Sequence, residues 1–124
     1  MTKARSILVV EDDEWLGEQH ERTLKAAGYH VDVVAHALAA MDMIDNTLPD
    51  AIILDVLLAG PNAFTLLHEL QSHTDLASIP VILCTNSARD LADEDIAAYG
   101  VRQVLDKATM RPDDVIAAVK KVLM

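Results

Sequence analysis

Short apolar runs of strand length recur five times along this chain of 124 residues, and most of them are continuous rather than alternating. Continuous apolar runs are typical of strands that are buried on both faces of a parallel sheet. A segment of helix length follows each run, so the sequence predicts strands that alternate with single helices and right-handed crossovers. The predicted strands are Ile7–Val10, Val31–Ala35, Ala51–Leu54, Val81–Cys84 and Val104–Leu105.

The segments between these runs carry apolar residues at helical spacing. Gly28 and Gly100 are placed to end helices, and Pro112 suits the first turn of the last one. The positions that define the five predicted helices are Leu16, His20, Leu24 and Ala27; Ala37, Met41 and Ile44; Phe64, Leu67 and Leu70; Ala88, Ala92, Ile96 and Tyr99; and Val115, Val119, Val122 and Leu123.

The fold class follows from this repeated (βα) pattern. No Gly-x-Gly-x-x-Gly follows the first run and no Gly-Lys-Ser/Thr occurs, so the nucleotide-binding folds lack their phosphate loops. Five strands in a short chain favour the flavodoxin-like strand order 2-1-3-4-5, a doubly wound α/β three-layer sandwich. The length suits one hydrophobic core, and we expect a single domain over residues 1–124 with no output domain.

Polar residues follow four of the five apolar runs at the point where each run ends. They are Glu11 and Asp12 after the first, Asp55 after the third, Thr85 after the fourth and Lys107 after the fifth. The carboxyl ends of parallel strands meet at one edge of the sheet, where ligands bind in open α/β folds. Neighbouring strands are about 4.8 Å apart, so we expect these side chains to converge.

Three converging carboxylates repel one another unless a cation lies among them. Oxygen ligands with few protein donors suit Mg²⁺, which prefers to share its ligands with a phosphoryl oxygen. A lysine and a hydroxyl nearby would then contact that phosphoryl group. A carboxylate beside Mg²⁺ can attack phosphorus to give an acyl phosphate, and Asp55, alone at the middle of the edge, is the best candidate nucleophile.

A simpler reading treats the acidic block as a solvated helix start, because acidic residues favour the first turn of a helix. This reading explains Asp13 and Glu14 well, but it explains the joint placement of the other polar residues poorly. Cys84 has no candidate base near it in the sequence and is expected to be a core residue rather than a nucleophile.

Four segments resemble the receiver domain of two-component response regulators, the CheY-like family. They are "ILVVEDDEW", "PDAIILDVLLAGPNAF", "IPVILCTNSA" and "VLDK", in the order and at the spacing of that family. Each segment alone is a weak signal, whereas the four together are specific and extend over nearly the whole chain. The resemblance implies Mg²⁺-dependent phosphorylation of an aspartate by a histidine kinase, a phosphotransfer protein or a small phosphodonor.

The resemblance also implies a role for each residue of the site. It assigns the metal ligands to Glu11, Asp12, Asp55 and the backbone carbonyl of Leu57; the phosphoacceptor to Asp55; the switch hydroxyl to Thr85; and the phosphoryl-pairing ammonium to Lys107.

The chain departs from the family pattern on the output side of the site. Val104 stands where an aromatic residue is common, and Ala108 stands where proline usually follows the lysine, often through a cis bond. A cis bond before a residue other than proline costs about 3 kcal/mol, so the sequence leaves the geometry of Lys107–Ala108 open. Further departures are Ala59, Asn62, Ala63 and Asn86.

The formal net charge of −10, from 10 basic and 20 acidic residues, argues against direct nucleic-acid binding. A single cysteine and the absence of an apolar run of membrane-span length favour a cytoplasmic protein without membrane contact. We expect a signalling module that binds a downstream protein and is an enzyme only for its own phosphotransfer and autodephosphorylation. The alternatives are a pseudo-receiver that binds partners without phosphorylation and a haloacid-dehalogenase-type phosphohydrolase, which would need an aspartate where Leu57 stands.

Overall fold

Five parallel strands form one sheet in the order β2-β1-β3-β4-β5, as the sequence predicted. The computed structural model describes residues 4–55, 63–85 and 99–124. The strands are β1 Ser6–Val10, β2 His30–Val34, β3 Ala51–Asp55, β4 Val81–Thr85 and β5 Val101–Asp106. The helices are α1 Glu14–Ala26, α2 Ala37–Asn46, α3 Ala63–Gln71 and α5 Pro112–Leu123.

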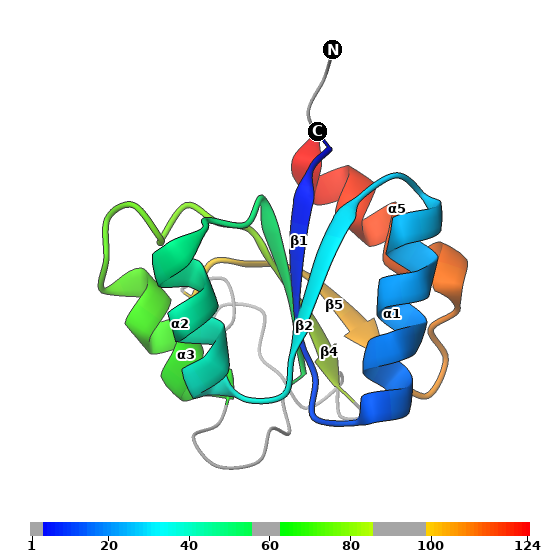
Figure 1. Cartoon of the computed structure of the whole chain (residues 1–124), viewed down its shortest axis with the longest axis horizontal. Helices are drawn as coiled ribbons and strands as arrows, with labels where there is room; N and C mark the ends of the chain where they lie inside the picture. The colour runs from blue at the N-terminus through cyan, green and yellow to red at the C-terminus, as the bar shows by residue number, and fades with distance from the viewer. Residues whose placement is uncertain (1–3, 56–62, 86–98) are drawn as a thin grey trace.

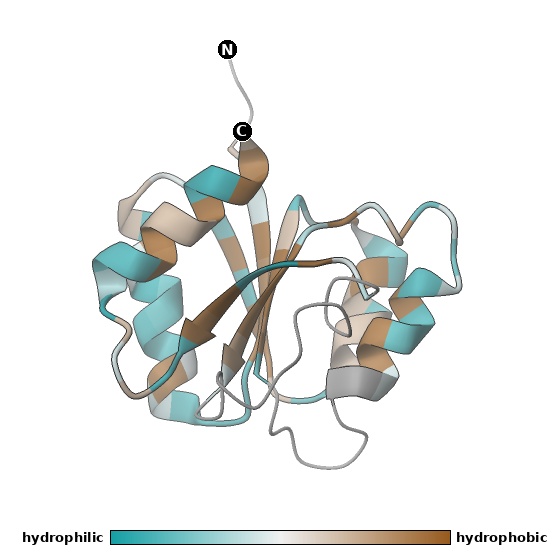
Figure 2. Ribbon diagram, turned by 180° about the vertical axis from the view of Figure 1, so that it is seen from behind, coloured by the Kyte–Doolittle hydropathy of each residue, from teal (hydrophilic) through white to brown (hydrophobic). Residues whose placement is uncertain are grey.

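The sheet is the middle of three layers, with α1 and α5 on one face and α2 and α3 on the other (Figure 1). Alternate residues of a strand point to opposite faces. Ile7 and Val9 therefore join the core under α1 and α5, while Leu8 and Val10 join the core under α2 and α3. Figure 2 shows the apolar strands between helices that carry both apolar and hydrophilic residues. This double burial explains why the strand sequences are continuously apolar.

Four of the strands extend slightly beyond their apolar runs, whereas β2 begins one residue before the predicted Val31–Ala35 and ends one residue before Ala35. Asp55 and Thr85 are the last residues of β3 and β4, so both belong to strands rather than to the loops after them. β5 is four residues longer than the predicted Val104–Leu105, because the polar residues Arg102 and Gln103 lie on this edge strand and interrupt its apolar pattern. The helix predicted around Ala88, Ala92 and Ile96 lies outside the described residues.

Helix α1 begins in the acidic block. The side chain of Asp13 caps the helix by accepting a hydrogen bond from the backbone N–H of Leu16 at 3.1 Å, and Glu14 lies in the first turn. The interpretation of these two acids as part of a helix start is therefore confirmed. The chain leaves the helix through Gly28, whose φ of 98° is in the left-handed region that favours glycine. None of the described helices is long and apolar enough to cross a membrane.

Cys84 provides a test of this core. Its side chain is 1% exposed on β4, and burial raises the pKa of its thiol to about 12. Because the thiolate is the reactive form, we expect iodoacetamide at pH 8 to leave the folded protein unlabelled and to label it rapidly in urea. Mass spectrometry reads the product directly, since the chain has one cysteine. Equal labelling rates in the folded and unfolded protein would contradict the described packing.

Candidate functional site

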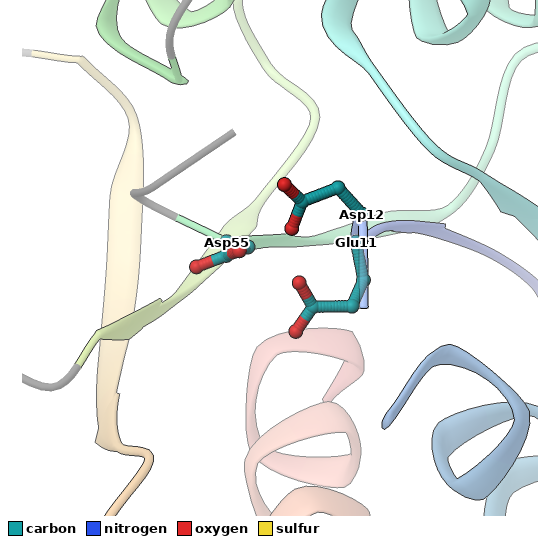
Figure 3. Close-up of side chains that lie close together, drawn as sticks. All are labelled: Glu11, Asp12 and Asp55. Atoms are coloured by element: carbon teal, nitrogen blue, oxygen red, sulfur yellow. The ribbon is translucent and has the colours of Figure 1, made fainter. Parts of the chain in front are cut away.

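Three carboxylates gather at the carboxyl ends of β1 and β3 (Figure 3). Glu11 and Asp12 directly follow β1, and Asp55 ends the neighbouring strand β3. One oxygen of each carboxylate lies within 4.8 Å of one oxygen of each of the others. The parallel register of these two strands, in which Val10 pairs with Leu54, places the three residues together. The sequence prediction that these acids converge is confirmed.

Lys107 extends from the end of β5 across β4 to reach these acids. Its ammonium nitrogen lies 2.8 Å from Oδ1 of Asp55 and 2.9 Å from Oε1 of Glu11. Its backbone N–H donates a hydrogen bond to the carbonyl oxygen of Thr85 at 2.9 Å, which ties it to the adjacent strand. The predicted meeting of a lysine from the fifth strand with acids from the first and third strands is therefore confirmed.

The charges at this centre do not balance. The side chains of Glu11 and Asp55 are only 2% and 3% exposed, and that of Lys107 is 15% exposed. Asp12 is exposed and is the third carboxylate of the centre, so three carboxylates lie near one ammonium. The second oxygen of Glu11, Oε2, is buried and has no hydrogen-bond partner among the described residues. A buried oxygen without a partner costs free energy, and a hard divalent cation would satisfy it, so this donor set fits Mg²⁺.

Burial and the neighbouring charges shift the pKa values at this centre. Burial, together with the hydrogen-bonded carboxyl of Asp55, raises the pKa of Glu11 to about 7, although Lys107 acts in the opposite direction. Burial alone would lower the pKa of Lys107, but the carboxylates of Asp55 and Glu11 outweigh it and hold that pKa above its ordinary value. The two carboxylates therefore stabilise the ammonium form of Lys107.

Thr85 is the last residue of β4, between β3 and β5, and is 3% exposed. The structure therefore places it at the same edge as the acids, where the sequence predicted it. The role of its hydroxyl as a switch stays a prediction. Leu57 and Asn86, which the sequence also singled out, lie outside the described residues.

Two departures from the family pattern, Val104 and Ala108, lie in the described part of the chain after β4. Val104 is half-buried on β5 and packs against the core under α2 and α3. The Lys107–Ala108 peptide bond is trans, because the described part of the chain contains no cis bond. The geometry that the sequence left open is therefore the ordinary one for a bond that does not precede proline.

Sequence reasoning missed one residue beside the site. The Oδ1 atom of Asp106 accepts a hydrogen bond from the backbone N–H of Ala108 at 2.8 Å, so the two residues bracket Lys107. The backbone carbonyl of Asp106 also accepts hydrogen bonds from the N–H groups of Thr109 and Met110. Aspartate is common in turns of this kind because its side chain bonds to the backbone two residues ahead. The aspartate in "DKA" was therefore a sequence signal for this turn.

Comparison with known proteins identifies a family for this arrangement. The family described as response regulator receiver domain matches residues 7–120. Response regulator MprA from Mycobacterium sp. (strain KMS) is 35% identical over 91 residues, which cover 73% of this chain and 38% of that protein. Transcriptional regulatory protein BaeR from Escherichia coli O6:H1 is 30% identical over 117 residues, which cover 94% of this chain and 47% of that protein. The chain thus spans less than half the length of these curated relatives.

Solved structures agree with this match. The signal receiver domain of a signal transduction histidine kinase from Syntrophus aciditrophicus is 31% identical with a TM-score of 0.82, covering 97% of this chain and 90% of that one. The chemotaxis response regulator CheY4 of Vibrio cholerae has a TM-score of 0.89 at 21% identity, covering 98% of this chain and all of that one. The second likeness supports the fold alone.

The ion pairs of Lys107 generate a prediction about stability. In Lys107→Gln, the buried carboxylates of Glu11 and Asp55 lose their ammonium partner. Leaving buried charges without a partner costs roughly 3 kcal/mol, and we expect the free energy of unfolding without added metal to fall by about that amount. Urea denaturation measures it, with Lys120→Gln, an exposed lysine of α5, as the control. Equal midpoints for the two variants would show that the contact contributes nothing.

Proposed function

Since this chain belongs to the family of response regulator receiver domains, we propose that phosphorylation of Asp55 controls it as a signalling module. One observation carries the proposal. Asp55 ends the middle strand of the sheet, with the ammonium of Lys107 2.8 Å from its Oδ1 and with an oxygen of Glu11 and of Asp12 within 4.8 Å. This arrangement suits a carboxylate that must approach a phosphoryl group despite the charge repulsion between them.

In the proposed reaction, an Oδ atom of Asp55 attacks phosphorus and forms a new oxygen–phosphorus bond. The bond from phosphorus to the donor breaks, and the donor leaves with its electron pair. The attacking group must be a carboxylate, and the ammonium of Lys107 places a positive charge 2.8 Å from Oδ1 of Asp55. That ammonium and the hydroxyl of Thr85 would then contact the phosphoryl oxygens, which carry the charge of the product.

The carboxylates of Glu11, Asp12 and Asp55 would hold Mg²⁺. When bound, the ion supplies positive charge that offsets the charge of the incoming phosphoryl group. The family resemblance adds the backbone carbonyl of Leu57 as a further ligand. The buried Oε2 of Glu11 supports metal binding at this centre, because the described residues give it no hydrogen-bond donor.

The phosphodonor would be a histidine kinase, a phosphotransfer protein or a small phosphodonor, and the product would be read by a downstream protein. We propose that this domain acts in the cytoplasm, contacts no nucleic acid itself, and catalyses only its own phosphotransfer and dephosphorylation. The net charge of −10 supports the absence of phosphate-backbone contacts. That the domain works without an attached output domain stays a prediction.

Removal of one carboxylate tests the metal assignment. We expect Asp12→Asn to weaken Mg²⁺ binding by about tenfold or more, because the ligand set loses one negative charge. Isothermal titration calorimetry measures the affinity. The matched control is Glu14→Gln, which changes a neighbouring acid in the first turn of α1 outside the cluster. The same loss in both variants would reduce the effect to general surface charge and contradict the assignment.

Replacement of the acceptor tests the reaction itself. With Mg²⁺ and acetyl phosphate, we expect the wild-type protein to gain the mass of one phosphoryl group and Asp55→Asn to gain none, because the amide is not a nucleophile. Intact-mass spectrometry makes the measurement. The control is Asp45→Asn, an exposed acid of α2, which should gain the group as the wild type does.

Each alternative function gives a different result in the same experiment. A pseudo-receiver would show no Mg²⁺-dependent adduct, although the complete acidic centre opposes that reading. A phosphohydrolase would turn over many phosphate esters, and release of inorganic phosphate would report it. If Asp55→Asn gained the phosphoryl group as Asp45→Asn does, the acceptor would be a residue other than Asp55.

A further inference from the structure

We infer that Asp106 is a positioning residue, which fixes the backbone of Lys107 so that its ammonium reaches the acidic centre. The inference rests on the proposed function, because the phosphoryl group is what Lys107 would serve. The side chain of Asp106 accepts a hydrogen bond from the backbone of Ala108, whereas the ion pairs to Glu11 and Asp55 are made by Lys107. Asp106 acts through Lys107 and is not itself a catalytic residue.

Two hydrogen bonds hold the backbone on either side of the Lys107 side chain. The N–H of Lys107 itself donates to the carbonyl oxygen of Thr85 at 2.9 Å. The N–H of the next residue, Ala108, donates to Oδ1 of Asp106 at 2.8 Å. Both peptide groups that flank the Cα of Lys107 are therefore tied down, one to the neighbouring strand and one to its own preceding side chain.

The second hydrogen bond depends on two residue types. Residue 106 must carry a short side chain with an acceptor that can reach two residues ahead, which aspartate supplies. Residue 108 must have a backbone N–H, which alanine supplies and proline lacks. "DKA" meets both requirements, so the turn is encoded by the residues on both sides of the lysine.

The geometry explains why Lys107 needs this support. Lysine has a flexible side chain of four carbons, and this one must cross from β5 past β4 to reach Asp55 on β3. The carbonyl of Asp106 also receives the N–H groups of Thr109 and Met110, so the turn leads directly toward α5. Release of the Asp106 side chain would free the peptide after Lys107 and let the ammonium move away from the acids.

The first test compares two substitutions at one position. In Asp106→Ala, we expect the maximal rate of phosphorylation by acetyl phosphate at saturating Mg²⁺ to fall about tenfold, because a small misplacement of a charged group is costly. Asp106→Asn keeps the Oδ1 acceptor and should restore most of that rate. Asp113→Ala, an exposed acid in the first turn of α5, is the matched control and should behave as the wild type.

The second test asks whether Asp106 acts only through Lys107. In a Lys107→Gln background, Asp106→Ala should lower the phosphorylation rate little further than Lys107→Gln does alone, because a positioning residue then has no ammonium to position. Losses that multiply would show that Asp106 acts by another route and would overturn the inference.

A spectroscopic readout keeps the inference testable even without phosphorylation. In protein labelled with ¹⁵N-lysine, the ammonium signal of Lys107 is identified by its absence from Lys107→Gln. We expect that signal to keep its position in Asp106→Asn and to shift in Asp106→Ala. An unchanged signal in Asp106→Ala would overturn the inference, whereas a wild-type protein that gains no phosphoryl group would instead overturn the proposed function.

Discussion

The contact of the Lys107 ammonium with two buried carboxylates is the interaction on which the functional edge of this protein depends. Glu11 and Asp55 stand at the ends of strands that are otherwise apolar, where ionised groups are costly unless a cation lies close. One ammonium lowers that cost without removing it, because Asp12 adds a third carboxylate and an oxygen of Glu11 has no partner among the described residues. This excess of negative charge destabilises the centre by itself, and the same excess favours the binding of a divalent cation.

The sheet order is what allows this contact to form. In the order β2-β1-β3-β4-β5, the acids of β1 and β3 are neighbours, and Lys107 must pass only β4 to reach them. Parallel pairing keeps all these strand ends on one edge, so four segments far apart in the sequence meet there. The two apolar cores, one on each face, hold the strands in this register and supply the low exposure that makes the charges matter.

The sequence predicted most of this arrangement because its signals are physically simple. Doubly buried strands read as continuous apolar runs, and a polar residue after such a run marks a strand end, which located Asp55 and Lys107. β5 was predicted too short because the polar residues Arg102 and Gln103 interrupt the apolar pattern of this edge strand. Asp106 was missed because its side chain accepts a hydrogen bond from the backbone, and the spacing of apolar residues gives no sign of such a bond. The role of Leu57 concerns a residue outside the described part of the chain and stays a prediction.

The central claim is that one phosphoryl position is shared by the acids of two strands and the lysine of a third. A crystal structure of the protein with Mg²⁺ and beryllofluoride tests it most directly, since beryllofluoride takes the place of a phosphoryl group on a carboxylate. The account predicts beryllium on a carboxylate oxygen of Asp55, a fluorine against the ammonium of Lys107, and the metal held by Glu11 and Asp12. Beryllofluoride on another residue, or a Lys107 turned away from it, would contradict the account.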